Sequence, residues 1–362
     1  MKVLVLVEDY PNLQNGHNLM YVHTRNAYYV KKGIIVDTLN FSAKQCYDID
    51  GVHVISYDYY KKTKEKYDLL ILHAANIRHH YVFLKKYGKY FNRLMFFYHG
   101  HEVLKINSVY PKPYPYIKVN DFKNKFQDFY DCIKLYIWKK YLPKIVEKSS
   151  FVFVSNWMKE EFEKWTKISL KEINAKYVIT YNCVGSVFEK ESYDDVSLKK
   201  YDFVTIRGNL DVSKYSIDIV NELAKKSPKS KFLVVGKGDF FKHYEKANNI
   251  EWWDKTLNHY EIIKVLNDSR FALMPTRTDA QGLMMCEMAA FGIPVITSDI
   301  PVCHEIFDGF SNAYFINNSS IQSLDDFINK DSLCKKDSRY FFDNTVSKEY
   351  LLIDSSLSGV RD

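Results

Sequence analysis

The sequence contains no closely spaced pair of cysteines. Six cysteines are spread along its 362 residues, at Cys46, Cys132, Cys183, Cys286, Cys303 and Cys334. None forms a C-x-x-C pair, and nothing else in the sequence points to secretion. We therefore expect reduced thiols in a cytoplasmic protein rather than a fold held by disulfides.

Long apolar runs are also missing. No segment approaches the roughly 18 consecutive apolar residues that a transmembrane helix needs. The first run, residues 3–7, is too short for a signal peptide and is followed at once by Glu8 and Asp9. The sequence therefore predicts no membrane-spanning segment. It leaves open a cytoplasmic location at the inner face of a membrane.

The chain has no dense stripe of Lys and Arg interleaved with stacking aromatic residues. Its formal net charge of +7 is diffuse. Such a charge suits an anionic ligand or an anionic membrane surface, but it does not indicate nucleic-acid binding. We also find no D-x-D motif placed after a predicted strand, so we expect neither a metal ion nor another cofactor.

The order of predicted elements indicates an α/β protein. A length of 362 residues fits two domains. Short apolar runs, typical of strands buried on both faces, alternate with segments of helical pattern, which predicts doubly wound parallel sheets. The expected strands include residues 3–7, 52–56, 68–73, 94–98, 151–154, 203–206, 231–235, 271–274 and 294–297.

Composition suggests where the two domains divide. We expect an N-terminal Rossmann-like domain over residues 1–190, a polar linker around 186–200, and a second Rossmann-like domain over 200–334. Residues 335–362 contain one plausible helix, near 346–353. We expect this C-terminal segment to cross back to the N-terminal domain.

The stretch from Tyr110 to Lys148 differs from the rest of the chain. It begins with YPKPYPY, which favours a loop, and continues as one or two long helices rich in aromatic and Lys residues. An amphipathic helix of this composition can rest on an anionic membrane. The alternative is an ordinary pair of helices packed into the core.

The most informative stretch runs from Met274 to Glu305. A strand ends at Pro275, and Gly282 then permits close backbone approach as a helix begins. Such a helix N-terminus suits a phosphate group. Asp279 precedes the helix and Glu287 lies about one turn inside it, so both carboxylates are expected at the strand ends, where ligands bind in open α/β sheets. The alternative is a surface loop with Glu287 solvated. The apolar run LMMCEMAAF argues against it, because an unpaired carboxylate is costly there.

These residues resemble the retaining glycosyltransferases of family 4, which have the GT-B fold. Their hallmark is E-x7-E within a stretch like EGFGLxxxEAMAxGxPVV, and this sequence reads DAQGLMMCEMAAFGIPVI. The resemblance implies two Rossmann-like domains facing a central cleft. It also implies a donor site that includes Gly282, Leu283, Met284 and Glu287. In this site Glu287 would accept hydrogen bonds from the ribose of the donor. Asp279 replaces the first Glu, which approaches the donor sugar in the family.

Other motifs follow in the family's order. The segment FVTIRGNLDVSKYS at 203–216 resembles a strand and loop that carry Arg and Lys for the donor diphosphate. Lys214 occupies the Lys position. Asn209 occupies the Arg position, so we expect Arg207 to act instead from a shifted loop. The segment VVGKGD at 234–239 resembles the family's V-G-x-G strand end, which implies donor binding at Gly236. The segment around 257–263 resembles the one that packs beside the base.

The N-terminal half also resembles the family. The segment FFYHGHEV at 96–103 matches a strand followed by H-G-x-E, which implies that His99 lies against the donor sugar and that Glu102 orients the site. A metal site at His99 and His101 would need more ligands than the nearby sequence offers. The loop from Pro11 to Gly16 occupies the position that faces the acceptor, so Gly16 is a candidate acceptor-side residue.

The resemblance implies transfer of a sugar from a nucleoside diphosphate sugar with the anomeric configuration retained. A UDP-sugar is favoured and a GDP-sugar is possible. The acceptor would be a glycan or a lipid-linked glycan, in the synthesis of a cell-surface polysaccharide. His99, Asp279, Arg207 and Lys214 are the candidate catalytic residues. Two alternatives stay open: a sugar-nucleotide epimerase of the same fold, and a non-catalytic relative that binds the nucleotide sugar.

Overall fold

The computed structural model describes residues 1–12, 19–329 and 335–358. The chain forms two compact units. The first contains Met1–Ile106, Gln127–Asn182 and the segment from Thr345 onward, and the second contains Asn107–Phe126 and Cys183–Asn344. This division differs from the expected boundaries, because residues 107–126 go with the second unit and the return segment starts at Thr345.

The first unit is built on one sheet in the order β3-β4-β2-β1-β5-β6-β7-β8. All neighbouring strands are parallel except β3, which is antiparallel to β4. The apolar run of β1 is buried from Val3 to Val7, as expected of a central strand. The strands are β1 (Lys2–Val7), β2 (Ile35–Asn40), β3 (Tyr47–Ile49), β4 (Val52–Ser56), β5 (Leu69–His73), β6 (Leu94–Tyr98), β7 (Ser149–Phe153) and β8 (Lys176–Ile179).

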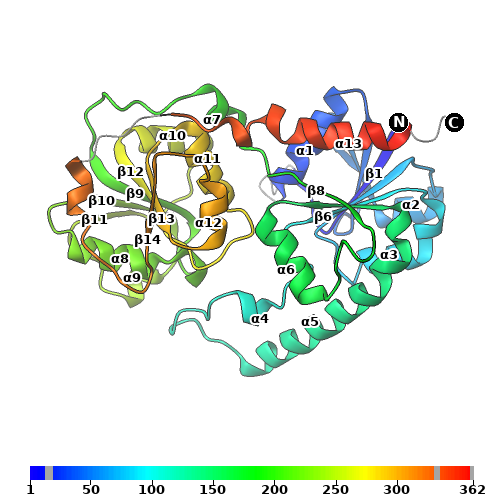
Figure 1. Ribbon diagram of the computed structural model, residues 1–362, viewed down its shortest axis with the longest axis horizontal. Helices are drawn as coiled ribbons and strands as arrows, with labels where there is room; N and C mark the ends of the chain where they lie inside the picture. Colours follow the sequence, from blue (N-terminus) through cyan, green and yellow to red (C-terminus); the bar gives the residue numbers. More distant parts are fainter. Residues whose placement is uncertain (13–18, 330–334, 359–362) are drawn as a thin grey trace. The chain divides into compact units, whose positions relative to one another are not determined.

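Helices cover both faces of this sheet (Figure 1). The helices α1 (Met20–Lys31) and α13 (Val346–Ser358) lie on one face. The opposite face carries α2 (Tyr57–Thr63), α3 (His80–Tyr87), α5 (Asp121–Tyr141) and α6 (Asn156–Thr166). The short helix α4 (Ile106–Val109) precedes α5 in the chain.

A buried ion pair joins α1 to α13. The Arg25 Nε donates to both carboxylate oxygens of Glu349, at 3.0 and 2.9 Å, and both side chains are fully buried. Hydroxyl groups of Tyr29 and Thr180 donate to the same carboxylate, each at 2.8 Å. Every buried charge here has hydrogen-bonded partners, so the last helix is an integral part of the first unit.

The second unit has a fully parallel sheet in the order β11-β10-β9-β12-β13-β14. Its strands are β9 (Tyr201–Asn209), β10 (Phe232–Lys237), β11 (Ile250–Trp253), β12 (Ser269–Met274), β13 (Val295–Ser298) and β14 (Ala313–Ile316). The chain adds strands in one direction from β9 and then returns to add the rest on the other side. This is the Rossmann strand order, and it confirms the predicted doubly wound architecture.

Helices also cover both faces of the second sheet. The helices α8 (Ile217–Lys226) and α9 (Phe240–His243) lie on one face. The helices α10 (His259–Asn267), α11 (Leu283–Phe291) and α12 (Pro301–Ile306) lie on the other, and α7 (Ser186–Lys190) packs against α10 and α11. The helix α10 begins with a capping box formed by Asn258 and Glu261.

The stretch from Tyr110 to Lys148 contains a single long helix, α5, preceded by a loop and followed by a 3-10 turn. Five of its large apolar side chains are exposed: Phe122, Phe126, Phe129, Ile133 and Tyr136. The expectation of a core-packed pair of helices is therefore wrong, because the stretch forms one long helix with one buried and one exposed face. Within the described ranges, no helix has both the length and the hydropathy needed to cross a bilayer.

Candidate functional site

The candidate site of the second unit lies where the strand order reverses, at the carboxyl ends of β9 and β12. Ligands bind at this point in open α/β sheets. Arg207 lies on β9 close to its end, and the loop from Pro275 to Gly282 follows β12. The expectation that Arg207 acts from a shifted loop is wrong, because the strand continues to Asn209.

Arg207 is a buried cation with one unused donor. Its Nη2 donates to the Pro275 carbonyl at 2.8 Å, and its guanidinium lies 4.9 Å from the centre of the Tyr215 ring. Its Nε is buried and has no hydrogen-bond partner among the described residues. Burial lowers the pKa of Arg207, but a guanidinium stays charged at neutral pH. The site therefore holds a fixed positive charge that can still bind an anion.

Lys214 and Asp279 face each other across the two loops. The Lys214 Nζ lies 3.9 Å from Asp279 Oδ2, and both side chains are about one fifth exposed. The rings of Tyr110 and Tyr215 lie 5.8 and 4.9 Å from the same Nζ. A separation of 3.9 Å exceeds a hydrogen bond, so both groups can still bind a ligand.

Hydrogen bonds fix the two loops to each other. The Lys214 carbonyl accepts from the Arg277 amide at 2.9 Å and from the Thr276 hydroxyl at 3.0 Å. The Arg277 guanidinium forms a two-pronged ion pair with Asp218, at 2.9 and 2.5 Å. The Tyr114 hydroxyl donates to the same carboxylate at 2.9 Å. This network sets the positions of Lys214 and of the segment that carries Asp279.

The helix α11 starts with an open N-terminus. Gly282 has a φ of 69°, which favours glycine, and no side chain caps the helix there. The Gly282 carbonyl accepts from the amides of Met285 and Cys286. The half-buried Leu283 and Met284 form the first turn. Because the first amides of a helix have no partner within it, this end can bind a phosphate next to Arg207 and Lys214.

Glu287 is buried in the second turn of α11. Burial raises its pKa to about 8. The His259 Nε2 lies 3.9 Å from Glu287 Oε1 and is itself half-exposed. His259 packs edge-on to the Phe188 ring at 5.3 Å. A Cβ on Gly185 would lie 2.8 Å from the His259 ring, so Gly185 makes room for it. Glu287 thus belongs to a separate corner of the site, next to the start of α10.

Gly236 contacts the end of β9 directly. Its φ is 154°, and a Cβ at this position would lie 2.3 Å from the Arg207 carbonyl oxygen. Any side chain would therefore push against the backbone that carries the guanidinium. Gly236 supports Arg207 through close backbone packing.

The first unit contains a pair of histidines at adjacent strand ends. His73 is the last residue of β5 and His99 follows β6. The His73 Nδ1 lies 3.0 Å from the His99 Nε2. Burial lowers the pKa of both rings well below the usual histidine value, so both are neutral at pH 7. The Tyr21 ring packs against His99 with centres 4.7 Å apart.

Glu102 holds the loop that carries His99. Its carboxylate accepts hydrogen bonds from the backbone amides of His99 and Gly100, the latter at 2.9 Å. Burial raises the pKa of Glu102, an effect that these hydrogen bonds oppose. Its position under the loop fits the expected orienting role. Gly16, the other candidate acceptor-side residue, lies outside the described residues.

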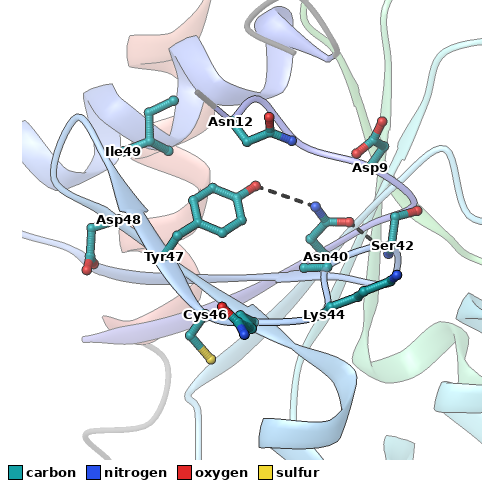
Figure 2. Close-up of a pocket in the computed structure, with 11 residues that line it drawn as sticks. Asp9, Asn12, Asn40, Ser42, Lys44, Cys46, Tyr47, Asp48 and Ile49 are labelled. Atoms are coloured by element: carbon teal, nitrogen blue, oxygen red, sulfur yellow. Dashed lines mark hydrogen bonds between the residues drawn. The ribbon is translucent and has the colours of Figure 1, made fainter. Parts of the chain in front are cut away.

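A cavity of about 520 Å³ opens beside the carboxyl ends of β1 and β2 (Figure 2). The Tyr47 hydroxyl lies 3.5 Å from the Asn40 side-chain nitrogen and donates to the Pro11 carbonyl at 3.0 Å. The lining residues are Asp9, Asn12, Asn40, Ser42, Ala43, Lys44, Gln45, Cys46, Tyr47, Asp48 and Ile49. The amide, hydroxyl and carboxylate groups among these residues can form hydrogen bonds with a ligand that carries hydroxyl groups.

The structure brings Arg207, Lys214, Asp279 and Gly282 together at one pair of strand ends. Sequence reasoning missed His73 and the specific contact of His259 with Glu287. A polar residue that ends a buried strand, as His73 does in DLLILH, is a signal that could have been used. Within the described residues, no group of three or more His, Cys, Asp or Glu side chains lies close enough to hold a metal ion.

Residues 203–330 match the family model of Glycosyl transferases group 1. The O-antigen biosynthesis glycosyltransferase WclY of Escherichia coli is 31% identical over 115 residues, which cover 29% of this chain. The match spans 31% of the length of that curated relative.

Two solved structures share the fold across the chain. Sucrose-phosphate synthase from Thermosynechococcus elongatus aligns with a TM-score of 0.72 and 13% identity, over 99% of both chains. Anabaena HepE in complex with UDP and glucose aligns with a TM-score of 0.63 and 12% identity, over 99% of this chain and 100% of that one. The predicted GT-B fold is therefore confirmed, and the second unit carries a glycosyl transferases group 1 domain.

Proposed function

We propose that this protein is a retaining glycosyltransferase that uses a nucleoside diphosphate sugar. The donor is a UDP-sugar in our proposal, with a GDP-sugar as the second choice. Two similar structures support uracil, since HepE is described in complex with UDP and glucose and an Escherichia coli protein is described as bound with UDP-2-fluoro glucose.

One observation carries the proposal: three features suited to a diphosphate meet at the switch point of the second sheet. Arg207 has a buried, unused Nε, Lys214 is free of any close hydrogen bond to Asp279, and α11 presents an open N-terminus. A leaving diphosphate gains negative charge as its bond to the sugar breaks. Fixed positive groups placed beforehand lower the barrier of that step.

In the proposed reaction, an acceptor hydroxyl attacks the anomeric carbon from the side of the leaving group. The bond between that carbon and the diphosphate oxygen breaks, and the bond to the acceptor oxygen forms on the same face. The acceptor proton passes to the leaving phosphate oxygen. No side chain is therefore assigned as a general base, and Asp279 approaches the transferred sugar.

Glu287 would accept hydrogen bonds from both hydroxyls of the ribose. It is the buried carboxylate next to the start of α10, the segment expected beside the base. His99, positioned by His73 and Glu102, would donate a hydrogen bond to a hydroxyl of the transferred sugar. The cavity lined by Asn40 and Tyr47 is the proposed acceptor pocket.

The acceptor in this proposal is a glycan or lipid-linked glycan used to build a cell-surface polysaccharide. The role of WclY in O-antigen biosynthesis supports this choice. We place the protein in the cytoplasm, at the inner face of the membrane. We further propose that Arg207 and Lys214 replace a metal ion at the diphosphate.

The proposal is tested by incubating the purified protein with a panel of UDP- and GDP-sugars and measuring release of the nucleoside diphosphate, with and without EDTA. Release from one donor that persists in EDTA and disappears in Glu287→Ala is the expected result. Glu222→Ala, at a half-exposed position of α8, is the matched control and should keep full activity.

Other outcomes separate the alternatives. A changed sugar nucleotide after incubation with donor alone would identify an epimerase. Nucleotide binding in ligand-observed NMR without turnover, even with a panel of glycan acceptors, would identify a binding protein. Absence of any nucleotide binding would overturn the proposed donor site.

A further inference from the structure

The outer face of α5 carries a continuous row of exposed apolar side chains. Phe122 is 77% exposed, Phe129 63% and Tyr136 63%, with Phe126 and Ile133 between them. At 3.6 residues per turn, these five positions fall within an arc of about 80°. They form one stripe from Phe122 to Tyr136, which we call the α5 stripe.

The opposite face of α5 packs against the first unit. Trp138 is buried and packs edge-on against Tyr81 at 5.9 Å. The buried Lys134 Nζ donates to the carbonyls of His101 and Leu104, each at 2.7 Å, and pairs with Asp131 at 2.6 Å. These contacts fix the rotation of the helix, so it cannot turn to bury the α5 stripe.

Basic side chains flank the stripe. Lys125, Lys139 and Lys140 are exposed, and the Lys140 Nζ lies 5.8 Å from the centre of the Tyr136 ring. Among the acidic residues of α5, Asp131 is fully buried on the other face and is paired with Lys134, and Asp128 is half-buried. The surface offered by α5 therefore combines aromatic rings with positive charge, in a chain whose net charge is +7.

We infer that the α5 stripe docks on an anionic lipid surface. Aromatic rings on one side of a helix enter the boundary between headgroups and acyl chains, while neighbouring lysines contact the lipid phosphates. A second copy of the chain fits less well, because the lysines beside the two stripes would repel each other. The inference deepens the proposed function, on which it rests, by naming the element that brings the enzyme to a lipid-linked acceptor.

The test is flotation of the intact protein with vesicles. Vesicles of phosphatidylglycerol and phosphatidylcholine should carry the protein upward, and vesicles of phosphatidylcholine alone should carry much less. The double variant Phe126→Ser/Phe129→Ser should lower partitioning at least about 10-fold, because two large apolar side chains no longer enter the lipid. Lys139→Gln/Lys140→Gln should lower it by roughly 5-fold per lysine.

Tyr90→Ser, at an exposed aromatic position elsewhere in the first unit, is the matched control and should bind vesicles like the wild type. Unchanged flotation of Phe126→Ser/Phe129→Ser would overturn the inference. A wild-type dimer in analytical sedimentation that is absent in this variant would also overturn it, because the stripe would then bind a second copy of the chain. Release of nucleoside diphosphate in solution should be the same in the variant as in the wild type. A failure of lipid docking can thus be told apart from a failure of the proposed activity.

Discussion

The hydrogen bond between His73 and His99, 3.0 Å from Nδ1 to Nε2, determines which nitrogen of His99 carries its proton. The other nitrogen of His73, Nε2, is buried and has no partner among the described residues. A buried N–H without an acceptor is costly, so the proton of His73 belongs on Nδ1. His73 then donates a hydrogen bond to His99 Nε2. His99 keeps its own proton on Nδ1 and can donate a hydrogen bond from Nδ1 to a ligand.

Replacing His73 with Phe should therefore disturb His99 while keeping the packing. The new ring can still stack on Phe97, whose centre lies 4.3 Å from that of His73. We expect kcat to fall about 10-fold, the value of one oriented neutral hydrogen bond. In ¹⁵N NMR spectra, His99 should change from one tautomer to a mixture. His80→Phe makes the same exchange at another buried histidine and should leave the His99 signals unchanged. A single unchanged tautomer in His73→Phe would contradict the positioning role.

Glu287→Gln should make the unliganded protein more stable at alkaline pH. The folded-state pKa of Glu287 is raised from 4.5 to about 8 by burial, so the folded protein keeps this proton to higher pH than the unfolded chain does. The contribution of this proton to the free energy of unfolding is fully present below about pH 4.5. It falls by about 1.4 kcal/mol per pH unit as the pH rises from there toward 8. Glutamine does not ionise and avoids this loss.

Thermal unfolding measures this effect. The Tm of Glu287→Gln should match that of the wild type near pH 4.5 and exceed it near pH 8.5, and Glu222→Gln should behave like the wild type at both. At pH 8.5, added UDP should raise the Tm of the wild type more than that of Glu287→Gln, because the ionised carboxylate offers acceptors to both ribose hydroxyls. The same pH dependence in both proteins would contradict the assignment.

Lys214→Met should reduce kcat for nucleoside diphosphate release by about 100-fold, the loss expected when one charge-stabilising donor is removed from a transition state. The Lys214 backbone contacts with Thr276 and Arg277 remain, so the fold should be unchanged. Lys225→Met, on the exposed side of α8, should keep full activity. Equal rates of nucleoside diphosphate release for both variants would contradict the role of Lys214 in the donor site.

Gly236→Ala should destabilise the second unit and impair donor binding together. The added Cβ would lie 2.3 Å from the Arg207 carbonyl oxygen, so the end of β9 must shift. Overpacking of this kind costs about 1–3 kcal/mol. Gly309→Ala, also at a positive φ but with open space around it, is the control for backbone strain alone. Calorimetry and UDP titration of the two variants should show lost affinity only for Gly236→Ala.

Local patterns predicted the elements well. Apolar runs located β1, β5, β6 and most of the second sheet, because a strand buried on both faces leaves a continuous signal in the sequence. The helix expected near residues 346–353 begins at Val346 in the structure, as α13. The strand β14 escaped prediction because its residues are only half-buried and its sequence, AYFI, is short.

The relationships between distant residues were harder to predict. Lys214 and Asp279 approach each other only because β9 and β12 are neighbours in the sheet, which no local pattern encodes. The stripe on α5 has the spacing of a core-facing helix, so periodicity alone could not distinguish it from the buried face that contains Trp138. Burial in the folded unit settles which face is exposed.

The ion pair between Arg25 and Glu349 has a consequence for how the protein is made. The two residues are 324 positions apart, and the whole second unit is synthesised between them. While the chain is still emerging from the ribosome, α1 lacks the carboxylate that neutralises its arginine, and a buried unpaired guanidinium is strongly unfavourable. The unit that is translated first is thus completed last, and its final packing step waits for α13. The second unit, whose core is nearly continuous in sequence, can fold in the meantime.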